Sequence, residues 1–163
     1  MNAIDTVPAP AQEGKSRLEY DKASPDVLRA MFALEMAVRK TGIEASLLDL
    51  VKLRASQING CAYCIDLHVR EALDKGETLR RLNLLPVWHE VPHLYTSRER
   101  AAIAWTEAVT LIAQTHVPDE VFAQARQEFT ETELVNLNLA VVAINGWNRF
   151  AISFRKMPDD VKH

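Results

Sequence analysis

The sequence predicts an all-α protein of about seven helices. Ala and Leu are its commonest residues and Gly occurs only 5 times, a composition that favours helix over sheet. No stretch of convincing length alternates apolar and polar residues, as a half-buried strand would. With 163 residues and a mass of 18.4 kDa, the chain has the size of one domain, which can bury a core without disulfide cross-links.

The chain is expected to begin with an arm, residues 1–23, which precedes a helical domain, residues 24–163. The arm is polar and contains Pro8 and Pro10, so we predict an extended segment that is either loose or laid on a partner subunit. Ser24-Pro25 then supplies an N-cap and a proline at the first helical position. The helix that begins there is expected to end at Gly42.

Capping and breaking residues predict the remaining helices. The expected elements are helices over about 45–58, 61–75, 77–85 and 131–154, one helix capped by Thr96 or Ser97 that includes Ile112, and one from Pro118 to about Phe129. Thr130 and Glu133 have the spacing of a capping box for the last of these helices. The segment 86–95 contains two prolines and is predicted to be a loop.

Charge and hydropathy exclude several classes of protein. The chain has 19 Lys and Arg against 22 Asp and Glu, a net charge of -3, and no basic block that would bind nucleic acid. No run approaches the roughly 18 apolar residues of a membrane helix. The first residues lack the basic and apolar regions of a signal peptide. We therefore expect a cytoplasmic protein with neither a nucleic acid nor a membrane as its partner.

The pattern that indicates chemistry is CxxCxxxH, formed by Cys61, Cys64 and His68. A CxxC pair in a reducing compartment is redox-active or metal-binding. On a helix these three side chains share one face. Asn59-Gly60 places Cys61 at a helix N-terminus, where unpaired N–H groups and the helix dipole favour a thiolate. His68 can accept the proton of Cys64, and such settings lower a thiol pKa from about 8.5 to roughly 3.5–7.5.

Two other interpretations of the cysteines remain open at this point. They could be buried structural cysteines, or they could form a structural zinc site with His89 and His93, which we expect on the surface of a proline-bounded loop. Haem attachment requires CxxCH, whereas Ile65 follows the second cysteine. A thioredoxin-type motif would lie beside a βαβ pattern, whereas this neighbourhood is predicted to be helical.

The segment 53–68, LRASQINGCAYCIDLH, closely resembles the core of the alkylhydroperoxidase D-like (AhpD-like) proteins of the carboxymuconolactone decarboxylase superfamily. The similarity extends over about 17–154 and includes RLEY at 17–20, ERAA at 99–102 and WTE at 105–107. The resemblance implies an AhpD-like helical bundle that assembles into a homo-oligomer, either a dimer, a trimer or a hexamer. It also implies a peroxide-reducing dithiol site that requires no metal and no organic cofactor.

The resemblance implies a role for each of four residues. Cys64 matches the peroxide-attacking cysteine, Cys61 the resolving cysteine and His68 the histidine of a proton relay. Asp49 matches the acidic residue of that relay, at a position where the family usually has Glu. Tyr63 occupies a position where characterised peroxidases of the family can have His, and a phenol of pKa near 10 does not readily shuttle protons near neutrality.

We therefore expect a CxxC-dependent peroxidase or a general dithiol–disulfide oxidoreductase. Asp49 would orient His68, and the Cys64 thiolate would attack the peroxide to give a sulfenic acid, which condenses with Cys61. An external dithiol must then reduce the disulfide, and the resemblance implies a lipoyl-bearing or thioredoxin-like protein. The alternatives are a carboxymuconolactone-decarboxylase-type lyase, which has no use for a CxxC pair, and a non-catalytic redox-sensing oligomer.

Overall fold

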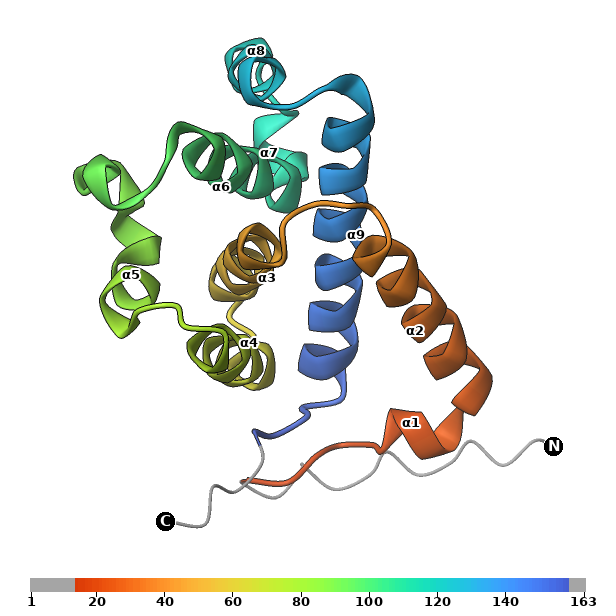
Figure 1. The fold of residues 1–163 in the computed structure, drawn as a ribbon. Helices are drawn as coiled ribbons and strands as arrows, with labels where there is room; N and C mark the ends of the chain where they lie inside the picture. The colour runs from red at the N-terminus through yellow and green to blue at the C-terminus, as the bar shows by residue number, and fades with distance from the viewer. Residues whose placement is uncertain (1–13, 159–163) are drawn as a thin grey trace, which may run out of the picture.

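A computed structural model describes residues 14–158, in which all regular structure is helical, so the predicted fold class is confirmed (Figure 1). The elements are α1 (Tyr20–Ala23), α2 (Pro25–Arg39), α3 (Ala45–Asn59), α4 (Ala62–Asp74), α5 (Leu79–Leu84), α6 (Ser97–Thr110), α7 (Ile112–Thr115), α8 (Asp119–Glu128) and α9 (Glu131–Ser153), with short 3₁₀ helices η1 (Leu85–Glu90) and η2 (Pro92–Leu94). Because α1 and α7 are single turns of 4 residues, seven longer α-helices remain in the described range, as the sequence predicts.

The helices begin and end near the predicted residues, although the Ser24 side chain makes no capping hydrogen bond to α2. Pro25 is the first residue of α2, and Gly42 follows the helix with a φ of +80°. At the start of α9 the backbone N–H of Glu133 donates to Thr130 Oγ1 (3.2 Å), and the Thr130 N–H donates to Glu133 Oε2 (2.8 Å). This reciprocal pair is the predicted capping box. It gives hydrogen-bond acceptors to two backbone N–H groups that have no partner within the helix.

Three segments differ from the prediction. Residues 85–94 form η1 and η2 instead of an irregular loop, because Pro86 and Pro92 each lie in a first helical turn, where a missing N–H costs nothing. The helix expected to include Ile112 ends at Thr110 and resumes as α7. Residues 20–23 of the predicted extended arm form α1, whereas 1–13 lie outside the described residues.

The arm residues that the structure describes pack on their own chain. The ring of Tyr20 lies 5.5 Å from that of Phe150 and 5.5 Å from that of Phe154, centroid to centroid. The backbone N–H of Arg17 donates to the Phe154 carbonyl (2.9 Å). These contacts join the segment before α2 to the end of α9, so the two ends of the described chain lie together (Figure 1).

Helix α3 is central, in contact with α4, α6 and α9, while α2 lies along α9 (Figure 1). One apolar cluster lies among α2, α3, α6, α8 and α9, and a second among α3, α4, η1 and α6. Helix α3 therefore has buried residues around most of its circumference, and the polar residues Asp49 and Lys52 are buried with them. No helix within 14–158 is long and apolar enough to cross a membrane.

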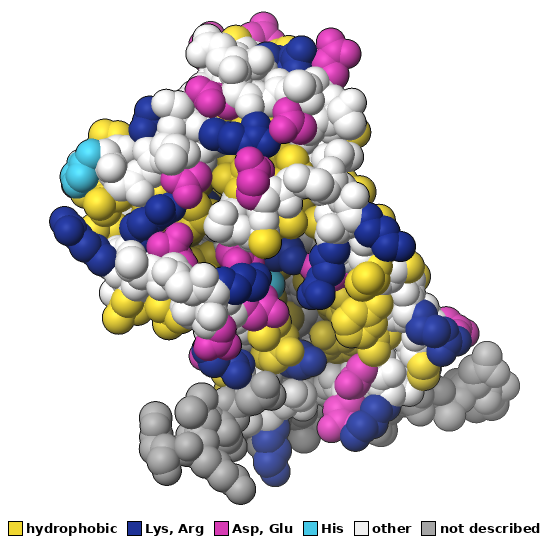
Figure 2. Space-filling model, viewed as in Figure 1, with side chains coloured by type: hydrophobic (Ala, Val, Ile, Leu, Met, Phe, Trp, Pro, Cys, Tyr) yellow, Lys and Arg dark blue, Asp and Glu magenta, His cyan; other side chains and the backbone are white. Residues whose placement is uncertain are grey.

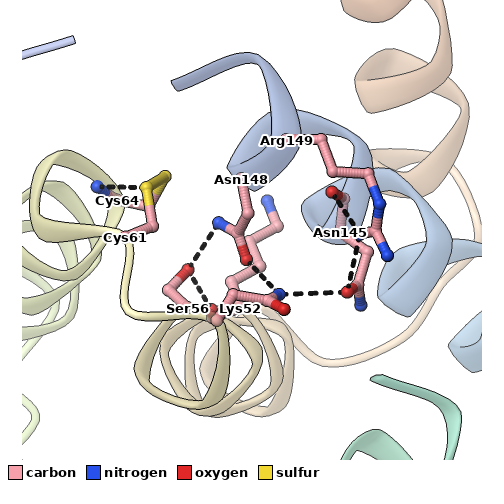
Figure 3. Close-up of a disulfide and its surroundings, with 8 residues drawn as sticks. Lys52, Ser56, Cys61, Cys64, Asn145, Asn148 and Arg149 are labelled. Carbon is pink, nitrogen blue, oxygen red and sulfur yellow. Dashed lines mark hydrogen bonds between the residues drawn. A yellow bond between two sulfur atoms is a disulfide. The ribbon is translucent and has the colours of Figure 1, made fainter. Parts of the chain in front are cut away.

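A hydrogen-bond network holds the end of α3 against α9 (Figure 3). The fully buried Asn148 donates from Nδ2 to Ser56 Oγ (3.0 Å) and accepts at Oδ1 from Asn59 Nδ2 (2.8 Å). Asn59 Nδ2 also donates to Asn145 Oδ1 (3.0 Å). Buried amides are retained only when they are hydrogen-bonded, and this set fixes the turn in which the next two residues, 60 and 61, lie.

Candidate active site

The two cysteines lie where α3 ends and α4 begins. Gly60 ends α3 in the left-handed region, with a φ of +70°, and the Cys61 N–H donates to the Ser56 carbonyl (3.0 Å). Cys61 is then the N-cap of α4, and its sulfur accepts the N–H of Cys64 (3.3 Å). The predicted place of Cys61 at a helix N-terminus is therefore confirmed. A disulfide joins Cys61 and Cys64, whose Cα atoms are 5.3 Å apart (Figure 3).

The two cysteines differ in what reaches them. Both are buried, at 1% exposure for Cys61 and 3% for Cys64. Cys64 lines a cavity of about 300 Å³, whereas Cys61 is not among the residues that line it and packs with Ala151 and Tyr63. A molecule in the cavity therefore reaches Cys64 before Cys61.

The cavity lies among α2, α4 and α9 and is largely apolar. It is lined by Tyr20, Asp21, Leu28, Phe32, Glu35, Arg39, Lys52, Tyr63, Cys64, Leu67, His68, Glu71, Ile144, Trp147, Ala151 and Lys156. Figure 2 shows the hollow in this part of the surface, with acidic and basic side chains around it and apolar side chains over α2 at its right edge. On one wall of the cavity, the ring centroids of Phe32 and Trp147 are 5.3 Å apart. Gly146 allows this close packing of α2 on α9, because a Cβ there would lie 3.0 Å from the end of the Met31 side chain.

His68 lies on α4 one turn after Cys64, and both line the cavity. The imidazole is 7% exposed, and its Nδ1 is hydrogen-bonded to Glu71 Oε2 at 2.9 Å. This hydrogen bond to His68 holds the pKa of the Glu71 carboxyl below its ordinary value, against the opposing effect of burial. A carboxylate on one ring nitrogen orients the ring and leaves Nε2 for a proton transfer.

Asp49 is placed differently from the other three predicted residues. It is buried on α3, and its two carboxylate oxygens accept from Lys75 Nζ at 2.7 and 2.9 Å. It is not among the residues that line the cavity. The carboxylate hydrogen-bonded to His68 in the described chain is thus Glu71, which the sequence analysis did not single out. Glu71 could have been found from the sequence, because residues three apart on one helix are neighbours on its surface.

An ion-pair network forms a second polar group in the cavity. Lys52, 8% exposed, pairs with Glu35 of α2, and Arg39 Nε lies 3.6 Å from the same carboxylate. The sequence analysis missed this network, because Lys52 and Glu35 belong to different helices and no local pattern links them. It joins α2 to α3 in the cavity that Cys64 also lines.

Lys156 follows α9 and extends over two aromatic rings of the cavity. Its Nζ lies 4.5 Å from the ring centroid of Tyr63 and 5.8 Å from that of Tyr20. Burial lowers the pKa of Lys156, but Tyr20 and Tyr63 outweigh it, so the pKa is raised above its ordinary value. The ammonium is therefore charged near neutral pH.

The histidines of the possible zinc site are not gathered with the cysteines. The side chain of His89 is 67% exposed, with its Nε2 3.6 Å from Glu107. Among residues 14–158, no three His, Cys, Asp or Glu side chains are grouped so as to hold a metal ion.

Comparisons with known proteins agree with the fold and with the family resemblance. The model of the carboxymuconolactone decarboxylase family matches residues 25–108. The uncharacterized protein YdfG of Bacillus subtilis (strain 168) is 36% identical over 137 residues, which are 84% of this chain and 92% of that protein.

Solved structures show the same architecture. A protein of unknown function from Agrobacterium tumefaciens, with a suggested role in antioxidant defence as an AhpD protein, is 45% identical with a TM-score of 0.87, over 90% of this chain and all of its own. An uncharacterized peroxidase-related protein of Ralstonia eutropha JMP134 with an alkylhydroperoxidase AhpD core is 20% identical, with a TM-score of 0.73, over 86% of this chain and 75% of its own.

Proposed function

Because the chain belongs to the carboxymuconolactone decarboxylase family, we propose that it is the CxxC-dependent kind of member, a peroxidase that reduces organic hydroperoxides through a dithiol–disulfide cycle. The observation that carries this proposal is the asymmetric disulfide. Cys64 lines a cavity together with a buried histidine, while its partner Cys61 lies behind it at a helix N-terminus.

The first step uses the cavity side of the pair. His68 takes the proton of Cys64, and the resulting thiolate attacks the terminal oxygen of the hydroperoxide. The S–O bond forms as the O–O bond breaks, and the alkoxide leaves as an alcohol after protonation by the imidazolium. Cys64 is then a sulfenic acid and the peroxide has been reduced by two electrons.

The second step uses the buried side. The Cys61 thiol loses its proton, and its thiolate, stabilised by the N-terminus of α4, attacks the sulfur of the Cys64 sulfenic acid. The S–S bond forms as the S–O bond breaks, and the hydroxide takes up the proton released by Cys61 and leaves as water. The disulfide of the structure corresponds to this oxidised state. An external dithiol returns the pair to two thiols and is itself oxidised to a disulfide. We propose a lipoyl-bearing or thioredoxin-like protein as that reductant.

Thiol counting tests the proposal, because the chain contains only 2 cysteines. One equivalent of cumene hydroperoxide should remove both thiols of the reduced protein and yield one equivalent of alcohol. Cys64→Ser should leave the peroxide unconsumed, whereas Cys61→Ser should consume one equivalent and accumulate a sulfenic acid on Cys64 that dimedone traps. Equal peroxide consumption by Cys64→Ser and the unmutated protein would contradict the mechanism.

Turnover separates the proposal from its alternatives. With dihydrolipoamide or reduced thioredoxin in excess, a peroxidase consumes many equivalents of hydroperoxide per chain. A redox-sensing oligomer is oxidised once and is not restored by these dithiols. A lyase of the decarboxylase type keeps its activity in Cys61→Ser and Cys64→Ser, because acid–base chemistry does not require a thiol.

A further inference from the structure

One cationic side chain of the cavity lacks a carboxylate partner. The cavity's charged side chains are Asp21, Glu35, Arg39, Lys52, Glu71 and Lys156. Glu35 is paired with two basic side chains and Glu71 with His68, as described above, while Asp21 Oδ1 accepts the backbone N–H of Lys22 (3.0 Å). Within the described chain, no carboxylate lies within ion-pair distance of the Lys156 ammonium: Tyr20 and Tyr63 are its nearest partners, and Asp21 acts on it only from a longer distance.

The backbone holds Lys156 in this position. Arg155 has a φ of +51°, in the left-handed region, and thereby turns the chain back on the end of α9. The Lys156 N–H then donates to the Ala151 carbonyl (2.8 Å), and Ala151 itself lines the cavity. A half-buried cation that makes no direct ion pair is stabilised by an anion that reaches it, since it has already lost part of its hydration.

The rest of the cavity suits an apolar body. Leu28, Phe32, Leu67, Ile144 and Trp147 contribute apolar surface to its walls. A volume of about 300 Å³ is at the lower end for small-molecule sites, so it can enclose a short chain or one ring. Apolar walls with one cationic group that is not held in an ion pair suit an amphipathic anion.

We propose that the cavity binds an amphipathic organic anion, with its apolar body against the walls of α2, α4 and α9 and its carboxylate on Lys156. This assignment rests on the proposed function in one respect: the substrate of the redox pair would then be an organic hydroperoxide that also carries a carboxylate. The binding step itself requires no thiol, so it can be measured in the oxidised protein.

Calorimetric titration of the oxidised protein with octanoate and with 1-octanol tests the assignment. The two probes share an apolar body and differ in the charged end. We expect octanoate to bind about tenfold more tightly, because a charge-assisted contact is stronger than a neutral one. Lys156→Gln should remove this preference and Lys156→Arg should keep it. Lys40→Gln, at an exposed residue that does not line the cavity, should bind both probes as the unmutated protein does.

Two outcomes would overturn the inference: an equal affinity for octanoate and octanol, or a preference for octanoate that persists in Lys156→Gln. Neither result affects the proposed peroxidase, whose test is the consumption of neutral cumene hydroperoxide. Conversely, a protein that binds octanoate through Lys156 and consumes no hydroperoxide would support the anion site and contradict the peroxidase. The two proposals can therefore fail separately.

Discussion

At the scale of single residues, the proton relay depends on which carboxylate holds His68. Glu71 is one turn away on the same helix and bonded to the ring, whereas Asp49 is bonded twice to Lys75. The family's usual Glu is replaced here by a side chain one methylene shorter. Because Asp49 is engaged by Lys75 and Glu71 is bonded to the ring, we propose that Glu71 has the orienting role that was expected of Asp49.

A pair of matched variants checks this assignment. Glu71→Gln should slow the reaction of Cys64 with cumene hydroperoxide about tenfold to a hundredfold, the lower range for a positioned acid–base group, and should change its pH profile. Asp49→Asn should change the rate less than about twofold. Stopped-flow measurement of thiol loss between pH 5 and 9 gives both results. If Asp49→Asn lowers this rate more than Glu71→Gln does, Asp49 and not Glu71 is the carboxylate of the relay.

Acid stability is set partly by two carboxylates that share Arg98. The pKa of Glu44 is lowered mainly by its hydrogen bond from Arg98. The pKa of Glu133 is lowered mainly by its hydrogen bond from the Thr130 backbone N–H. Since both pKa values are depressed in the folded state, the stabilisation is present above the ordinary value of 4.5 and is lost as the pH falls below it.

Glu133→Gln is therefore expected to make the protein less sensitive to acid. The free energy of unfolding of the variant should fall less between pH 5 and pH 3 than that of the unmutated protein, because one linked proton is removed. Urea denaturation at a series of pH values measures the two slopes. An unchanged or steeper slope for the variant would contradict the linkage. Glu131→Gln, at an exposed neighbour of the same helix turn, is the matched control.

At the scale of elements, the joint between α3 and α4 determines where the sulfurs lie. Gly60 adopts a left-handed conformation, and the residue after it caps α4 with its own sulfur. Gly42, after α2, also has a positive φ, and neither glycine has atoms within 4 Å of the position of a Cβ. The cost of adding a methyl group at either site is thus backbone strain and not a steric clash.

Alanine at these two glycines should separate stability from chemistry. Each substitution should lower the free energy of unfolding by about 1–2 kcal/mol. Only Gly60→Ala should also slow disulfide formation after peroxide, by about tenfold, because a small shift of a reacting group has a large effect on rate. Denaturant melts and quenched-flow thiol counting measure the two effects. Equal rates for both variants would show that the joint does not position Cys61.

The elements also show what could be predicted from the sequence. The starts of α2 and α9 could be predicted from Ser24-Pro25 and from the Thr130–Glu133 box, because capping depends on residues close in sequence. The start of α4 could be predicted because Asn59-Gly60, just before the cysteines, ends the preceding helix. Three other contacts join residues of separate elements: Lys52 with Glu35, Lys75 with Asp49, and Lys156 with Tyr63. No sequence spacing encodes such contacts, since they depend on how the helices pack.

At the scale of the whole molecule, apolar side chains remain exposed over α2 and α9 (Figure 2). Phe32 and Met36 of α2 are 54% and 49% exposed, and Val135 and Val142 of α9 are 69% and 48% exposed. Large apolar side chains exposed on two helices that pack together are typical of an interface. We propose that the protein is a homo-oligomer, as its resemblance to AhpD-like proteins implies.

Sedimentation velocity should therefore give a mass that is a multiple of 18.4 kDa. Val135→Lys should shift the distribution toward a single chain, because it places a charge in the apolar surface of α9. Lys40→Gln serves again as the unperturbed control. A mass of one chain for the unmutated protein at micromolar concentration would refute the proposal.

The turn at Arg155 places the cation of the cavity on a segment whose sequence can change during evolution separately from the helices. The two cysteines and His68 belong to α4 and its N-cap, whereas the cation over the cavity belongs to a tail that follows the last helix. Substitutions in that tail can reverse or abolish the charge offered to an incoming compound without repacking any helix. If the proposed anion site sets substrate preference, we expect an exchange of residues 155–158 between relatives to change selectivity and to leave the reaction at Cys64 unchanged.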